Sequence, residues 1–272
     1  MPYRRLRPLL LPGAFIALAL VLGWALFGYL LPRWLDPANL IYKPATPSII
    51  ITDRQGRVLY EAIDPRGNKH VPLALDDIPA ACRDATIATE DANFYHHPGV
   101  DPIAIARAAW LNWRAGETVS GGSTLTQQLA RNLLLTAEER QERTLPRKLR
   151  EAWLAWRLER RYSKDELLAL YLNTTYYGHF ATGIEAASQA YFGVHAPELD
   201  LAQCALLAGL PQSPALYNPI ENPDAARARQ AVVLGLMVRH GYLEAVQAED
   251  ARREALAYAS TPFPIHAPHF VM

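Results

Sequence analysis

The chain has 272 residues, half of them hydrophobic, and its 27 basic and 27 acidic side chains give a formal net charge of zero. Because no net positive charge attracts a polyanion, we expect no nucleic-acid partner. A chain of this length has room for a membrane segment and one good-sized domain, with or without a small appendage.

The N-terminal region predicts a membrane anchor. Residues 9–31 carry no charged side chain and follow a cluster of three arginines. A run of this length can cross a bilayer as a helix. The basic flank places residues 1–8 in the cytoplasm and everything after Pro32 on the other side of the membrane, as a single-pass protein. A cleaved signal peptide is the alternative, but it would have a shorter apolar region and a cleavage site of small residues.

The remainder of the chain divides into three regions. Residues 32–76 combine a linker with a β hairpin, predicted from strand-like runs at 49–52 and 58–60. Residues 77–257 have helical spacing broken by glycine and proline, which predicts a mainly α-helical domain. Residues 258–272 are rich in proline and have no apolar period, so we interpret them as a linker towards a possible further domain.

The two cysteines leave their pairing open. Cys82 and Cys204 lie in alanine-rich helical segments, where a free cysteine often serves as a small core residue. Outside the cytoplasm the same two residues could form a disulfide.

The first polar cluster surrounds Glu90, in the segment EDANFYHHPG at 90–99. The apolar spacing before it predicts a helix that ends near Glu90. The helix dipole disfavours a carboxylate at this end, so we expect a raised pKa that suits Glu90 to general-base catalysis near neutral pH. A solvated helix end with a histidine in the turn is the alternative.

The second cluster is the segment GGSTLTQQ at 121–128. Thr124 and Gln127 have the spacing of a capping box, which predicts a helix beginning there. Gln128 and Arg131 then share a face with Thr124. A glycine-rich loop that enters a helix N-terminus can bind phosphate oxygens, although an ordinary capped amphipathic helix would give the same pattern.

The third cluster is the segment RKLRE at 147–151. On a helix, Arg147 and Lys148 lie four and three residues before Glu151, so both cations flank one carboxylate. Alone, this would be a surface ion pair of little energetic value. Together, the three clusters supply two acids and several cations, which can bind a pyrophosphate while one acid takes a proton from a hydroxyl.

These three motifs, with two more at 164–173 and 229–234, resemble glycosyltransferase family 51. This is the peptidoglycan transglycosylase domain of class A penicillin-binding proteins and of monofunctional transglycosylases. All five motifs occur in the family's order across roughly 77–257. The resemblance implies a mainly α, lysozyme-like helical domain, here with a small N-terminal β hairpin and one N-terminal transmembrane helix. It also implies inverting polymerisation of lipid II into β-1,4-linked glycan strands.

The resemblance implies a role for each motif residue. Glu90 would be the general base, and Glu151 would assist the departing polyprenyl diphosphate directly or by holding a divalent cation, Mg or Mn, which is not obligatory. The implied substrate-binding residues are Asp91, Phe94, His97, Ser123, Thr124, Gln127, Gln128, Arg131, Asn132, Arg147 and Lys148. The residues expected to support the cleft are Lys164, Tyr171, Asn173 and Arg229.

The implied partners are lipid II, the growing lipid-linked strand, the membrane and a cell-wall synthesis complex. The implied location is the bacterial inner (cytoplasmic) membrane, with the catalytic domain on the periplasmic or extracellular side. Between the first two clusters, Ile103, Trp110 and Trp113 alternate with Arg107 and Arg114, a composition suited to the headgroup zone. Packing of Trp110 in the core is the alternative.

Two other function classes fit parts of the sequence. A lysozyme-like peptidoglycan hydrolase or lytic transglycosylase would share the fold, but water attack on a neutral glycoside does not explain the cations around the second acid. A non-catalytic membrane-anchored wall scaffold would not depend on Glu90. The Ser-x-x-Lys and Lys-Thr-Gly motifs of a transpeptidase do not occur in the sequence, although 258–272 resembles the junction before such a domain.

Overall fold

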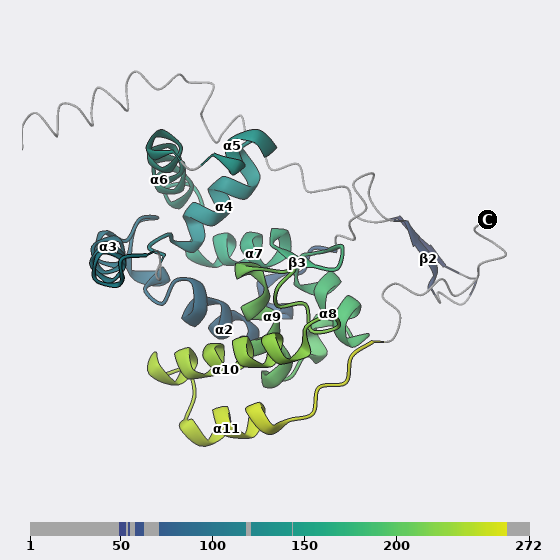
Figure 1. Ribbon diagram of the computed structural model, residues 1–272. Helices are drawn as coiled ribbons and strands as arrows, with labels where there is room; N and C mark the ends of the chain where they lie inside the picture. Colours follow the sequence, from purple (N-terminus) through teal and green to yellow (C-terminus); the bar gives the residue numbers. More distant parts are fainter. Residues whose placement is uncertain are drawn as a thin grey trace, which may run out of the picture. The chain divides into compact units, whose positions relative to one another are not determined.

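The computed structural model describes residues 49–52, Arg54, 58–62, 71–117, 121–142 and 144–259 (Figure 1). The predicted anchor and most of the C-terminal linker lie outside these residues. Among the described helices, none is both long and apolar enough to cross a membrane.

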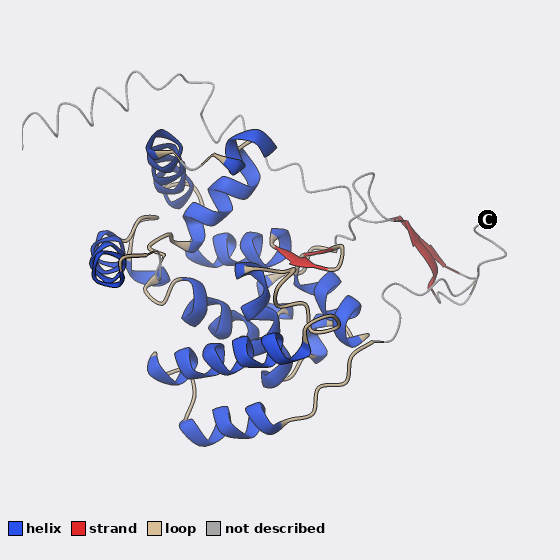
Figure 2. Ribbon diagram, viewed as in Figure 1, coloured by secondary structure: helices blue, strands red, loops and turns tan. Residues whose placement is uncertain are grey.

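The described part of the chain is mainly helical, as predicted (Figure 2). Its α-helices are α2 (Ala80–Glu90), α3 (Pro102–Ala115), α4 (Leu125–Leu134), α5 (Ala137–Gln141), α6 (Leu145–Glu159), α7 (Lys164–Thr174), α8 (Ile184–Phe192), α9 (Leu201–Gly209), α10 (Pro223–Arg239) and α11 (Ala245–Arg253). Short 3-10 helices are η2 (Leu75–Asp77), η3 (Phe94–His96), η4 (Ala196–Glu198) and η5 (Leu210–Gln212).

Two pairs of antiparallel strands accompany the helices. The strands β1 (Ile49–Thr52) and β2 (Val58–Ala62) pair with each other, which confirms the predicted hairpin. The strands β3 (Tyr176–Gly178) and β4 (Ala181–Thr182) form a second hairpin inside the region predicted as helical. The helical spacing of this region predicted no strands there.

One hydrophobic cluster of the core lies where α2, α9 and α10 pack together, with α11 against α9 and α10 (Figure 1). Alanines dominate it because their small side chains let helix backbones approach closely. The buried members are Ala85, Ala88, Ala202, Ala205, Ala208, Val233, Leu234, Met237 and Ala251.

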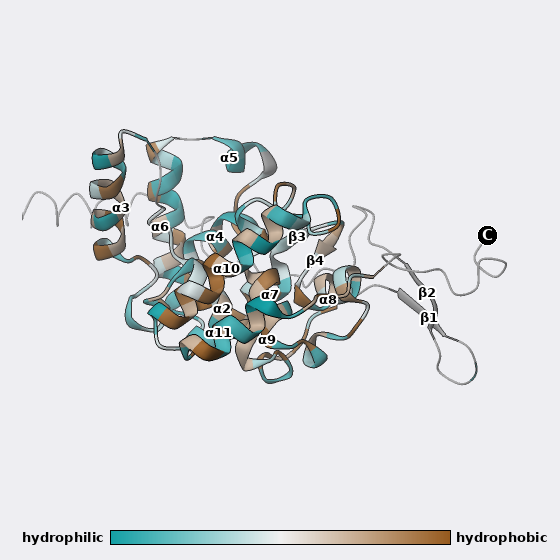
Figure 3. Ribbon diagram, turned by 60° about the horizontal axis from the view of Figure 1, so that its bottom comes forward, coloured by the Kyte–Doolittle hydropathy of each residue, from teal (hydrophilic) through white to brown (hydrophobic). Residues whose placement is uncertain are grey.

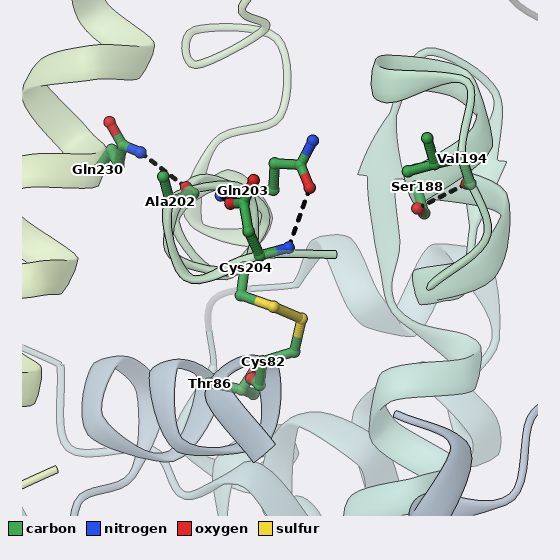
Figure 4. The surroundings of a disulfide bond; sticks show 9 residues. Cys82, Thr86, Ser188, Val194, Ala202, Gln203, Cys204 and Gln230 are labelled. Atoms are coloured by element: carbon green, nitrogen blue, oxygen red, sulfur yellow. Dashed lines mark hydrogen bonds between the residues drawn. A yellow bond between two sulfur atoms is a disulfide. The ribbon is translucent and has the colours of Figure 1, made fainter. Parts of the chain in front are cut away.

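A disulfide joins α2 to α9 beside this core (Figure 4). It links Cys82 with Cys204, whose Cα atoms are 4.5 Å apart and which lie 122 residues apart in the sequence. The two cysteines, whose pairing the sequence left open, therefore form a disulfide. It fixes α2, which ends at Glu90, to α9.

A second group of helices consists of α4, α6 and α7. Glu159 at the end of α6 accepts hydrogen bonds from Thr126 Oγ1 (2.5 Å) and from Lys164 Nζ (2.7 Å). Lys164 Nζ also donates to the backbone oxygen of His97 at 2.8 Å. The partly buried ion pair of Lys164 and Glu159 thus ties the starts of α4 and α7 to the loop that follows α2. The role of Lys164 in supporting the cleft stays a prediction.

Candidate active site

Glu90 is the last residue of α2, as the apolar spacing predicted. Its Oε2 accepts a hydrogen bond from Gln128 Nε2 of α4 at 2.7 Å. Burial raises the pKa of Glu90, while the bond from Gln128 and the positive charges of Arg229 and Arg131 lower it. The neighbouring charge of Asp91 raises it slightly further. The pKa of Glu90 is therefore shifted upward, as predicted, and burial is the largest cause of the shift.

Asp91 and His97 hold the loop after α2 against the start of α4. Both Asp91 oxygens lie within 3.0 Å of His97 Nε2, and Asp91 Oδ2 accepts the Leu125 N–H at 2.9 Å. The Gly99 N–H donates to His97 Nδ1 at 3.1 Å, so Nε2 carries the ring proton that Asp91 accepts. Both side chains are buried.

Phe94 is also buried in this loop, with Lys164 Nζ 4.4 Å from the centre of its ring. Asp91, Phe94 and His97 thus have partners inside the protein. Their role in contacting substrate stays a prediction.

The capping box at the start of α4 is confirmed. Thr124 Oγ1 accepts the Gln127 N–H, and the Gln127 side chain accepts the Thr124 N–H at 3.0 Å. Thr124 Oγ1 also donates to the Gly99 backbone oxygen at 2.6 Å. Both side chains are buried. The polar groups of Thr124 and Gln127 that were predicted to contact the substrate are therefore used by the cap. Substrate contact by Thr124 and Gln127 also stays a prediction.

Glu151 is fully buried on α6 and is held by both cations of its motif. Arg147 Nη1 donates to Oε1, and Lys148 Nζ donates to Oε2 at 2.9 Å. Lys148 Nζ also donates to Ser123 Oγ at 2.6 Å, in the loop that leads into α4. The geometry predicted from the spacing of this motif is therefore present.

A metal-ligand role for Glu151 stays a prediction. Cations hold both of its oxygens, and the described residues contain no cluster of three or more His, Cys, Asp or Glu side chains that could bind a metal ion.

Tyr171 and Arg229, which were predicted only to support the cleft, lie in the surroundings of Glu90. The Tyr171 hydroxyl on α7 donates to Gln128 Oε1 at 3.4 Å. Arg229 on α10 is close enough to lower the pKa of Glu90, and it also donates to the Gly209 backbone oxygen at 3.3 Å. No local spacing connects α7 and α10 to α2, so only the fold brings these two residues close to Glu90.

Arg131 and Asn132 lie in the last turn of α4 with partly exposed side chains. Arg131 acts on the pKa of Glu90, whereas Asn132 contributes its backbone oxygen to Arg140 at 3.5 Å. The prediction that these two residues bind substrate stays open to experiment.

The chain matches the family model described as Transglycosylase over residues 55–238. Penicillin-binding protein 1A of Aquifex aeolicus is 45% identical over 242 residues, which cover 89% of this chain and 32% of that protein. Penicillin-binding protein 1A/1B of Bacillus subtilis is 43% identical over 216 residues (79% and 23%), and penicillin-binding protein 1A of Escherichia coli is 41% identical over 233 residues (86% and 27%).

Among solved structures, the crystal structure of penicillin-binding protein 1A from Haemophilus influenzae aligns with a TM-score of 0.46 and 22% identity. The alignment covers 80% of this chain and 22% of that one. The chain thus spans about a quarter to a third of the length of the curated relatives it matches.

Proposed function

The chain belongs to the transglycosylase family of peptidoglycan glycosyltransferases, and we propose that it polymerises lipid II into β-1,4-linked glycan strands. The 4-hydroxyl oxygen of the acceptor sugar attacks the anomeric carbon of the donor, and its proton passes to Glu90. The bond from that carbon to the diphosphate breaks, and polyprenyl diphosphate leaves with the bonding electrons. Attack from the face opposite the leaving group inverts the configuration at the anomeric carbon.

The observation that carries this proposal is the contrast between the two glutamates. Glu90 has a raised pKa and one neutral hydrogen-bond donor, which suits a base that must take a proton near neutral pH. Glu151 is enclosed with two cations, which suits a site where negative charge develops on a leaving group. Ser123, beside the cations, lies in the loop that leads into α4, and Gln128, beside Glu90, lies in the first turns of that helix.

The cations near Glu151 have donors left for a diphosphate. Lys148 uses two of its three ammonium protons, on Ser123 and Glu151, so one remains. Among the described residues, Arg147 Nε is buried without a hydrogen-bond partner. Because buried donors are rarely left unsatisfied, a phosphate oxygen is a suitable partner for it.

Membrane contact is part of the proposal, since the substrate carries a polyprenyl chain. Hydrophobic residues lie along α3 (Figure 3), and Ile103, Trp110 and Trp113 are 74%, 53% and 81% exposed. The core alternative for Trp110 is therefore wrong. With the predicted anchor, and a disulfide that persists in oxidising compartments, these residues favour a catalytic domain on the outer face of the cytoplasmic membrane. Association with a cell-wall synthesis complex stays a prediction from the resemblance.

Purified full-length chain supplied with lipid II tests the proposal. We expect long glycan chains and released polyprenyl diphosphate, and we expect Glu90→Gln to lower the rate by roughly 10²–10⁴-fold, the usual loss for a missing general base. Asp84→Asn is the matched control, because Asp84 is a carboxylate on the same helix with a pKa that burial raises, whereas the side-chain amide of Gln128 donates to Glu90.

The same assay separates the other two function classes. A hydrolase or lytic transglycosylase would release soluble fragments from mature peptidoglycan and leave lipid II unpolymerised. A scaffold would give neither product. Polymerisation by Glu90→Gln at the rate of the unmodified chain would refute the assignment of Glu90 as the base.

A further inference from the structure

Two consecutive hydrogen bonds link Tyr171 through Gln128 to Glu90. Gln128 Nε2 donates to Glu90 Oε2 at 2.7 Å, and the Tyr171 hydroxyl donates to Gln128 Oε1 at 3.4 Å. Tyr171 lies on α7 and is 1% exposed, so water does not compete for its hydroxyl. Among the described residues, the Glu90 Oε1 atom receives no hydrogen bond.

The orientation of the Gln128 amide decides what Glu90 experiences. With Nε2 towards the carboxylate, the amide stabilises ionised Glu90; with Oε1 towards it, the amide would repel the negative charge. A hydroxyl that donates to Oε1 favours the first orientation. Burial and the charge of Glu90 raise the pKa of Tyr171 well above its ordinary value, so its hydroxyl keeps its proton and remains a donor.

We propose that Tyr171 and Gln128 are positioning residues for the base. Tyr171 fixes the orientation of the Gln128 amide, and Gln128 holds Oε2 of Glu90, which leaves Oε1 to take the proton of the acceptor hydroxyl. This inference rests on the proposed function, because it requires Glu90 to be the base. It gives Gln128 a role inside the protein in place of the predicted contact with substrate.

The groups around Glu90 determine how its pKa should change when the hydrogen bond from Gln128 is removed. Burial is the largest influence on its pKa, and the bond from Gln128 is the largest one that opposes burial. The other charges are Arg131 on α4, Arg229 on α10 and Asp91 beside it, and the buried tyrosines that Glu90 affects are Tyr171 on α7 and Tyr177 on β3. Without the hydrogen bond from the Gln128 side chain, less remains to offset the effect of burial, so the pKa of Glu90 should be higher.

The sign of the effect on activity follows. Glu90 acts as a base only when ionised, so the rate falls as the pH drops through its pKa. A higher pKa of Glu90 moves the low-pH part of the rate profile, its acid limb, to higher pH. The constant rate reached at high pH, the plateau, stays unchanged. A hydrogen bond of ordinary strength corresponds to a shift of about 0.5–1 pH units. A general structural defect would instead lower the plateau without moving the limb.

The experiment is a pH profile of kcat/KM for lipid II polymerisation by the full-length chain. We expect Tyr171→Phe to move the acid limb up by about 0.5 pH units and Gln128→Met to move it by about 1, with rates that recover at high pH. Tyr191→Phe is the matched control, because Tyr191 is a fully buried tyrosine whose hydroxyl donates to the Tyr177 backbone oxygen at 3.0 Å. Its limb should stay in place.

The outcomes separate this inference from the function on which it rests. An unmoved acid limb in Gln128→Met, with Glu90→Gln inactive, would overturn the positioning role and leave the base in place. Gln128→Met also carries the test if Tyr171→Phe fails to fold. Full activity of Glu90→Gln would overturn both proposals.

Discussion

Replacement of Gly99 by alanine should destabilise the domain strongly, because this residue combines a left-handed backbone with a close helix contact. Its φ is +91°, a conformation that side chains with a Cβ rarely adopt. An added Cβ would lie 2.8 Å from the backbone C and O atoms of Ala155 and 3.0 Å from Glu159 Cγ on α6. The backbone of α6 cannot move away without disturbing Glu151, which lies one turn earlier.

The expected magnitude is the sum of two costs. The left-handed conformation costs a residue with a Cβ about 1–2 kcal/mol, and an overpacked contact typically costs about 1–3 kcal/mol. The free energy of unfolding should therefore fall by roughly 2–5 kcal/mol. For a domain of this size, each 1 kcal/mol lowers Tm by roughly 2–4 °C.

Three other glycines separate the two costs. Gly116 has a φ of +71° and open space around it, so Gly116→Ala tests the conformation alone. Gly122 has no positive φ, and its added Cβ would lie 2.9 Å from Ile105 Cα, so Gly122→Ala tests the close contact alone. Gly235 lies in α10 with neither feature, and Gly235→Ala should stabilise the domain by about 0.5–1 kcal/mol.

Urea unfolding of the full-length chain, followed by circular dichroism, measures all four variants. The loss in Gly99→Ala should be close to the sum of the losses in Gly116→Ala and Gly122→Ala. If Gly99→Ala loses no more stability than Gly116→Ala, the close approach of the Gly99 loop to α6 is refuted.

The remaining predictions concern the disulfide, the β3–β4 turn and the buried ion pair. Replacement of Cys82 and Cys204 by alanine should lower the free energy of unfolding by up to about 5 kcal/mol, because the bond closes a long loop; an unfolding midpoint insensitive to dithiothreitol would contradict this. Phe180 has a φ of 60° and is 63% exposed, so Phe180→Gly should raise stability by about 1 kcal/mol, and a lower Tm would argue against strain there. Glu151→Gln removes the buried charge between two partly exposed cations and should cost about 1–3 kcal/mol together with most of the polymerisation rate, whereas wild-type Tm and rate would show that the ion pairs of Glu151 are dispensable.

The parts of the site that depend on local spacing could be predicted from the sequence. The end of α2 at Glu90, the capping box of Thr124 and Gln127, and the cations beside Glu151 all follow from contacts between residues three or four positions apart. Such contacts are fixed once the helix forms.

The parts that depend on distant contacts could not be predicted. Burial, which dominates the pKa of Glu90, is a property of the packed domain, and the contact of Tyr171 with Gln128 joins residues 43 positions apart. The β3–β4 hairpin was missed for a local reason. Its two central residues, His179 and Phe180, both have positive φ, and neither is the glycine or asparagine that usually marks such a turn.

The start of α4 is the element through which the two glutamates are positioned relative to each other. Gln128 contacts Glu90, Ser123 contacts Lys148 beside Glu151, and Asp91 accepts the first N–H of the helix. The buried cap fixes the boundary between the Ser123 loop and the helix, so a shift of α4 would move both contacts together. Under the proposed mechanism, buried polar residues of the motifs therefore contribute to catalysis because they set the separation between Glu90 and the cations beside Glu151, without touching the substrate.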